Sequence, residues 1–176
     1  SFFQNKDKMN FSPVNLYSSM KQSFEDIAKY YYESENIKFY TIKLSDTYGP
    51  DDRRPKLINL LLDSIKQEKF LNMHGNPNQV INLIHVDDVV NAFYSLIKKL
   101  DKIELKNGMI FSLKSEDPIN LRNLINLIEK IAGSKLKIKW GNNNEILISE
   151  PPEIFNIPNW KPKTSLKEGI RRLLNI

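Results

Sequence analysis

The apolar residues of this chain switch repeatedly between a helical spacing and short continuous runs. Residues 14–32 have apolar side chains at helical intervals, and residues 37–44 form a short β-rich run. The same change recurs along the chain, with no internal repeat. Helices that alternate with short buried strands are typical of α/β proteins. We therefore expect an α/β fold.

Local signals place the expected elements. Further strands are predicted at 70–73, 80–86, 109–113 and 136–140, and a helix at 87–100. Another helix is predicted from its stripe of Leu57, Leu61, Leu62 and Ile65.

Capping residues predict where three helices begin or end. Asp51 and Asp52 are suited to cap the helix with the Leu57 stripe, and Pro55 to stand in its first turn. Asn120 is expected to cap a helix that ends at Gly133. Ser165 and Glu168 form a capping box for a last helix that ends near Leu174. Residues 141–163 are expected to be mostly loop.

Composition narrows the class of protein. The 176 residues are 40% hydrophobic and 27% charged, which indicates one ordinary globular domain with a core of its own. The absence of cysteine excludes disulfides, and two distant histidines do not suggest a metal site. Lysine and arginine are dispersed despite the net charge of +5, so we expect no nucleic-acid partner. No apolar run is long enough to span a membrane, and the N-terminus does not resemble a signal peptide. We therefore expect no membrane association and a cytoplasmic location.

The pair Tyr17 and Lys21 has the clearest chemical meaning. Residues four apart on a helix lie on one face, one turn from each other. An ammonium near a phenol favours the phenolate and lowers the phenol pKa. Such a pair can move a proton to or from a sugar hydroxyl while a hydride moves to or from a nicotinamide. The alternative is a core tyrosine beside a lysine whose stem lies along the apolar surface.

Four segments together resemble the extended short-chain dehydrogenase/reductase family, which includes the NAD-dependent sugar-nucleotide epimerases and dehydratases. They are the helix Tyr17-Ser18-Ser19-Met20-Lys21 with Glu25, the turn Leu44-Ser45-Asp46-Thr47-Tyr48-Gly49-Pro50, the segment Ile84-His85-Val86-Asp87-Asp88-Val89 and the ending Trp160-Lys161-Pro162 with Ser165-Leu166. They occur in the family's order and cover most of the chain.

The resemblance implies part of a doubly wound Rossmann-like fold plus a smaller α/β lobe. Residues 1–50 would be the remainder of the Rossmann-like domain and 51–176 the nucleotide-sugar lobe, with 80–100 packing back on the Rossmann sheet. No glycine lies in a G-x-G-x-x-G pattern, so we expect the N-terminal dinucleotide-binding half to be absent. The family also implies a homodimer through the Tyr–Lys helix.

The same resemblance assigns site residues. Tyr17 and Lys21 would be catalytic, and with Ser45 they would contact NAD or NADP. Asp46, Lys56 and Leu57 would bind the nucleotide sugar, with Arg53 and Asn72 as further candidates. Ile81 stands where many members have an arginine on the diphosphate, so Lys56, Arg53 or Arg54 must replace that cation. His85, Asp87, Asp88 and Trp160 are interpreted as structural.

These assignments favour an enzyme that oxidises or reduces C4 of an NDP-hexose. The segment from Leu44 to Lys56 and the isoleucine at 81 resemble the branch that makes CDP-linked 3,6-dideoxyhexoses by reducing a 4-keto sugar nucleotide for surface polysaccharide. The alternative is a non-catalytic fragment, a dimerisation or substrate-binding module that does not bind NAD alone.

Overall fold

The computed structural model describes residues 15–35, 37–100, 108–142 and 155–176, and it is α/β as predicted. Its helices are α1 (Leu16–Ser34), α2 (Leu57–Lys66), α3 (Val86–Leu100), α4 (Leu121–Ala132) and α5 (Leu166–Leu174). Its strands are β1 (Thr41–Leu44), β2 (Asp46–Tyr48), β3 (Phe70–Met73), β4 (Val80–Ile81), β5 (Leu83–His85), β6 (Ile110–Leu113), β7 (Ile119–Asn120) and β8 (Lys137–Trp140).

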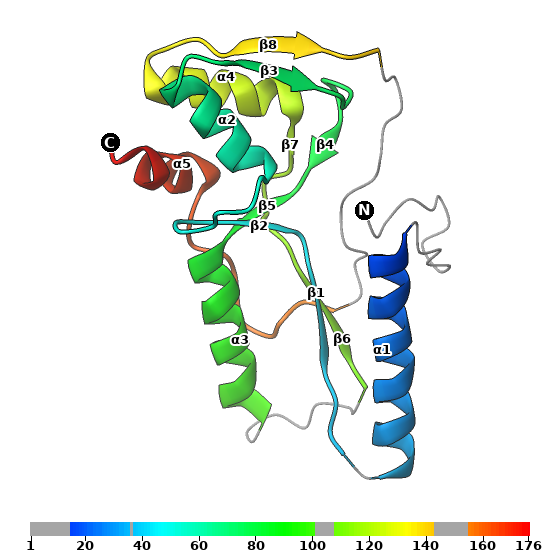
Figure 1. Ribbon diagram of the computed structural model, residues 1–176. Coiled ribbons are helices and arrows are strands. Elements are labelled where there is room, and N and C mark those ends of the chain that lie inside the picture. The colour runs from blue at the N-terminus through cyan, green and yellow to red at the C-terminus, as the bar shows by residue number, and fades with distance from the viewer. Residues whose placement is uncertain (1–14, 36, 101–107, 143–154) are drawn as a thin grey trace.

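The strands form four two-stranded ladders. β1 pairs with β6, β2 with β5 and β3 with β8, all in parallel, while β4 and β7 pair antiparallel. α1 and α3 stand on opposite sides of the β1–β6 pair (Figure 1). Parallel pairs with helices on both sides are the arrangement of α/β folds.

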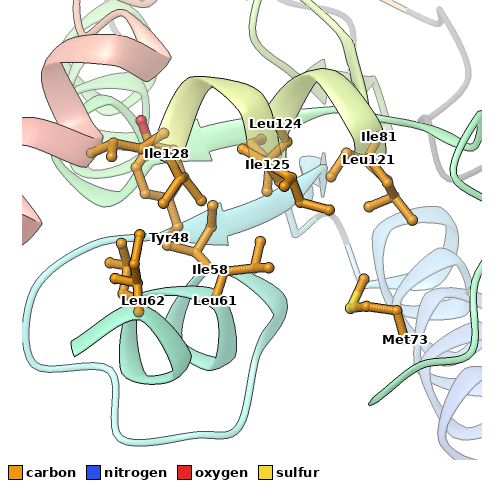
Figure 2. Packing of buried hydrophobic residues seen from close by; sticks show 13 residues of the cluster. Tyr48, Ile58, Leu61, Leu62, Met73, Ile81, Leu121, Leu124, Ile125 and Ile128 are labelled. Atoms are coloured by element: carbon orange, nitrogen blue, oxygen red, sulfur yellow. The ribbon is translucent and has the colours of Figure 1, made fainter. Parts of the chain in front are cut away.

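Two separate hydrophobic clusters hold the chain together. In the larger one, Ile58, Leu61 and Leu62 of α2 point towards Leu124 and Ile128 of α4 (Figure 2). The smaller cluster joins α3 to β1 and β6, and its buried members are Ile84, Val89, Ala92, Leu96, Phe111, Leu113 and Ile157. The segment from β4 to α3 therefore links both clusters, since Ile81 and Leu83 belong to the larger cluster and Ile84 to the smaller. The domain boundary at residue 50 stays a prediction.

Most of the expected element ends are confirmed. Asn120 caps α4 through its side chain, which accepts a hydrogen bond from the Asn123 N–H, and Gly133 ends the helix at a φ of 68°. Ser165 caps α5 in the same way. β3 has the predicted bounds, whereas the run at 37–44 is a strand only from Thr41, and β2 and β7 were not predicted. The predicted loop is observed where the structure describes it, at 155–163, while 143–154 lie outside the described residues.

The prediction that Asp51 or Asp52 caps α2 is wrong. Lys56 is the N-cap, and no side chain caps this helix. Asp52 instead accepts hydrogen bonds from the backbone and guanidinium of Arg54. Because the residue before a proline avoids the helical region, Arg54 and Pro55 continue the loop and the helix starts later.

The apolar stripe of α1 is largely exposed, and that of α3 is exposed along one side, while its Val89 and Leu96 are buried. On α1, Met20, Phe24 and Ile27 keep more than half of their surface, and on α3 Val90 and Ile97 do the same. The apolar periodicity predicted both helices correctly. Within the described residues, however, no other element covers these exposed side chains. No helix in the described part of the chain is long and apolar enough to span a bilayer.

Candidate substrate and catalytic site

The first turns of α1 carry Tyr17 and Lys21. Asn15 fixes the start of the helix by accepting a hydrogen bond from the Ser18 N–H at 2.9 Å. The Lys21 Nζ atom lies 5.6 Å from the centroid of the Tyr17 ring, so both side chains share one face. Tyr17 is 64% exposed. This exposure contradicts the alternative of a core tyrosine and leaves the phenol open to a ligand.

An ion pair anchors α1 to the neighbouring strand. Lys43 Nζ of β1 lies 3.1 Å from Glu25 Oε2, and the two side chains are only 10% and 24% exposed. Glu25 stands two turns after Tyr17 on the same helix. The pair therefore holds the orientation of the Tyr–Lys face relative to the end of β1.

Ser45 lies just beyond the carboxyl end of β1. Its backbone N–H donates to the Leu113 carbonyl at 2.9 Å, which continues the β1–β6 ladder by one residue. The Ser45 Oγ atom is buried and has no hydrogen-bond partner among the residues that the structure describes. Carboxyl ends of parallel strands are the usual location of ligands in α/β proteins. This hydroxyl is consequently available to a group that binds at this edge.

Asp46, Lys56 and Leu57 come together in one pocket of about 130 Å³. Its remaining lining residues are Thr47, Tyr48, Asp52, Ile58, Asn59 and Leu83. Complete small-molecule sites are about 300–1,000 Å³. This pocket therefore has room for one portion of a nucleotide sugar and not for the whole molecule.

Charged groups face each other across this pocket. Lys56 Nζ donates to the Thr47 carbonyl at 2.9 Å and lies 3.5 Å from Asp52 Oδ2. Burial raises the pKa of the Asp46 carboxyl, while the Lys56 ammonium opposes that shift. The hydrogen bond from Arg54 holds the pKa of Asp52 well below its usual range, so Asp52 is an anion at neutral pH.

Tyr17 is electrostatically close to the loop before α2. The pKa of Arg54 is raised mainly by its hydrogen bond to Asp52, and the Tyr17 phenol adds a smaller contribution.

Two of the expected substrate residues do not line this pocket. Arg53 is exposed in the loop before α2, and Asn72 is exposed in β3, where it pairs in register with Lys139. Sequence position alone could not show this, because the pocket is formed by β2, β5 and the start of α2.

Neither Asn82 nor Asn59 was assigned a role from the sequence. Both side chains make hydrogen bonds that fix neighbouring segments of the chain. The buried Asn82 donates to the Ser115 carbonyl and accepts from the Ser115 N–H, as a strand neighbour would. Asn59 donates to the carbonyls of Asp52 and Arg54 and so fixes the loop before α2. The sequence offered one indication of such a role, namely the asparagine at position 82 inside an apolar run, because a buried polar side chain needs hydrogen-bond partners.

The residues interpreted as structural are held by hydrogen bonds or packing within the chain. His85 is buried in β5, where Nδ1 accepts from the Asp87 N–H. The buried Asp88 accepts from the N–H groups of Lys163 and Thr164, and Trp160 packs on the smaller cluster. The C-terminal segment is thereby tied to α3.

The described residues suit one end of a dinucleotide. The exposed Tyr17 and Lys21 and the unpartnered Ser45 hydroxyl fit a nicotinamide and its ribose. Glycines stand at positions 49, 75, 108, 133, 141 and 169, and none forms the turn that receives a pyrophosphate. No group of three acidic or histidine side chains in the described parts is arranged to hold a metal ion.

These features define an α/β protein with a pocket formed by β2, β5 and the start of α2. Residues 3–111 match the model of the NAD dependent epimerase/dehydratase family. The chain belongs to this family, whose members use NAD(P).

Individual relatives are distant. The chain is 27% identical over 185 residues to CDP-abequose synthase of Salmonella typhimurium, covering 99% of this chain and 60% of the relative. It is 22% identical to UDP-glucuronate 4-epimerase of Thermodesulfobacterium geofontis, covering 93% of this chain and 50% of that protein.

A solved structure shows the same fold. The dTDP-glucose 4,6-dehydratase of Bacillus anthracis, in complex with NAD, superposes with a TM-score of 0.76 at 22% identity, over 98% of this chain and 55% of that one. The chain therefore spans about half to three fifths of the length of these relatives.

Proposed function

We propose that the chain is the substrate-binding and proton-transferring part of an NAD(P)-dependent enzyme that acts at C4 of an NDP-hexose. The observation that carries this proposal is the Tyr17–Lys21 pair on an exposed face of α1. The pocket with Asp46, Lys56 and Leu57 contains an ammonium and suits part of a phosphorylated ligand.

Proton transfer is the task of Tyr17. When bound, the nicotinamide supplies or accepts the hydride at C4. Tyr17 donates its hydroxyl proton to the C4 oxygen as a ketone is reduced, and takes the hydroxyl proton when an alcohol is oxidised. The Lys21 ammonium stabilises the phenolate left after donation. Ser45 orients the nicotinamide with its free hydroxyl.

The diphosphate of the substrate is assigned to the start of α2. Lys56 is the N-cap there, and its side chain makes no capping hydrogen bond to the first turn. A helix N-terminus and an ammonium both favour phosphate. Arg53 and Arg54 are the further cations of this loop. Asn72 of β3 is assigned to the nucleotide end of the substrate.

For the reaction branch, we propose reduction of a CDP-linked 4-keto sugar. The similarity to CDP-abequose synthase, over nearly all of this chain, supports this choice. An epimerase and a dehydratase match this chain at comparable identity. The choice of a reductase is therefore a separate step of the proposal, beyond the action at C4.

Replacing Tyr17 tests the mechanism. In a form of the protein that carries a dinucleotide-binding segment, Tyr17→Phe should lower kcat by about 10²–10⁴-fold, the usual contribution of a general acid or base. Nucleotide-sugar affinity and thermal stability should change little because the side chain is exposed. Turnover is measured as NAD(P)H oxidation with a 4-keto sugar nucleotide. Near-normal turnover in the variant would remove Tyr17 from the mechanism.

A second candidate function is a non-catalytic module that binds a nucleotide sugar or forms a homodimer through α1. The exposed stripe of Met20, Phe24 and Ile27 favours the dimer, since apolar surface of this extent is characteristic of interfaces. Sedimentation of the chain as a monomer at about 50 μM would contradict it.

A further inference from the structure

One carboxylate holds two of the three cations near the candidate diphosphate site. Asp52 Oδ1 accepts from Arg54 Nε at 2.7 Å, and Oδ2 accepts from Arg54 Nη2 at 2.9 Å. The same Oδ2 lies 3.5 Å from Lys56 Nζ. Asp52 thus faces a guanidinium fork and an ammonium at once.

A phosphate oxygen pair would make the same contacts. Guanidinium groups bind carboxylates and phosphates in the same two-pronged geometry. Asp52 also lines the pocket with Lys56, so its carboxylate stands within the space that a ligand would enter. A ligand that uses these cations has to take them from Asp52.

Charges in and around the pocket already cancel. Asp46, Asp51 and Asp52 are matched in number by Arg53, Arg54 and Lys56, and a dianionic ligand therefore meets a region with no net positive charge. Arg53 forms no ion pair within the part of the chain described here. Attraction at a distance is weak when the local charges sum to zero.

We propose that Asp52 is an internal counter-anion that competes with the diphosphate of the substrate for Arg54 and Lys56. The inference rests on the placement of the diphosphate at the start of α2 proposed above. Asp52 lowers the affinity for any pyrophosphate-bearing ligand, and its release from Arg54 and Lys56 accompanies binding. The substrate then exchanges one anionic partner for another rather than filling a vacant cationic site.

The test is Asp52→Asn in the 176-residue chain. Asparagine keeps the Oδ1 acceptor for Arg54 Nε, removes the charge, and replaces the Oδ2 acceptor that faces Arg54 Nη2 and Lys56 with an NH2 group. The probes are inorganic pyrophosphate and CDP, titrated by isothermal calorimetry at low and at physiological salt. Loss of one negative charge a few ångströms from a dianion should tighten both Kd values by about tenfold, and less at high salt.

Asp51→Asn is the matched control. It removes the same charge from the neighbouring residue, which has a φ of 61° that asparagine also adopts. Asp51 does not line the pocket, so its replacement should change either Kd by less than about twofold. Far-ultraviolet circular dichroism checks folding, and Asp52→Ser replaces Asp52→Asn if the latter does not fold.

The outcomes separate this inference from the proposed function. Equal or weaker binding by Asp52→Asn overturns the counter-anion role, and so does a failure of both proteins to bind either probe. If the wild-type chain binds CDP and Asp52→Asn does not bind it better, the proposed function stands without the counter-anion. If Asp52→Asn binds more tightly but Tyr17→Phe keeps normal turnover, the counter-anion stands and the catalytic assignment fails.

Discussion

At the scale of single residues, the ion pair between Glu25 and Lys43 controls how the Tyr–Lys face is held. Both side chains are mostly buried, and they join α1 to β1 at 3.1 Å. Few other buried side chains attach α1, whose only buried residues are Ser18 and Ala28. The position of Tyr17 therefore depends on a small number of contacts.

Removing one partner of this pair should destabilise the protein. Glu25→Gln leaves the Lys43 ammonium with less compensation, and we expect a loss of about 1–3 kcal/mol, below the value for a fully buried pair because Glu25 keeps some exposure. Chemical denaturation measures it. The exposed pair Lys29 and Glu33 supplies the control, and Glu33→Gln should cost under about 0.5 kcal/mol. Equal effects of the two variants would contradict the anchoring role.

The sequence predicted that Tyr17 and Lys21 share one face of a helix, but not how the charges beside the pocket pair. Tyr17 and Lys21 followed from helical spacing, which depends only on local geometry. The assignment of Asp52 to a cap was wrong because a capping preference does not reveal a competing guanidinium two residues away. Arg53 and Asn72 were placed by position in the chain, whereas the pocket depends on tertiary pairing.

At the scale of elements, α4 shows that capping residues in the sequence can predict where a helix begins and ends. Asn120 and Gly133 predicted both of its ends, and its residues Leu124 and Ile128 fill the larger cluster. By contrast, the stripes of α1 and α3 predicted helices without predicting exposure. Spacing specifies a face, but only a neighbour decides whether that face is buried.

The cap of α4 is directly testable. Asn120→Ala removes the acceptor for the Asn123 N–H and should destabilise the protein by about 1 kcal/mol. Asn123→Ala is the control, because it deletes an exposed side chain and keeps the cap. Thermal unfolding compares the two, and a smaller effect at 120 than at 123 would show that the cap contributes nothing.

At the scale of the whole molecule, the chain contains no glycine-rich pattern of the kind that binds a dinucleotide pyrophosphate. We expect the 176-residue chain to bind NADH weakly, with Kd above about 1 mM, since the ribose and nicotinamide contacts alone leave the diphosphate and adenosine unbound. NADH fluorescence measures this. A micromolar Kd would show that this chain holds the dinucleotide by other means.

The parallel pairing of β1 with β6, β2 with β5 and β3 with β8 has a kinetic consequence. First partners in these ladders are separated along the chain by 69, 37 and 67 residues. None of the ladders forms by closing a hairpin, so the entropy of long loops is lost before any pairing is gained. High contact order of this kind slows folding to milliseconds or seconds. The edge of β3 consequently stays unpaired until residues 137–140 have been synthesised, because β8 is its partner.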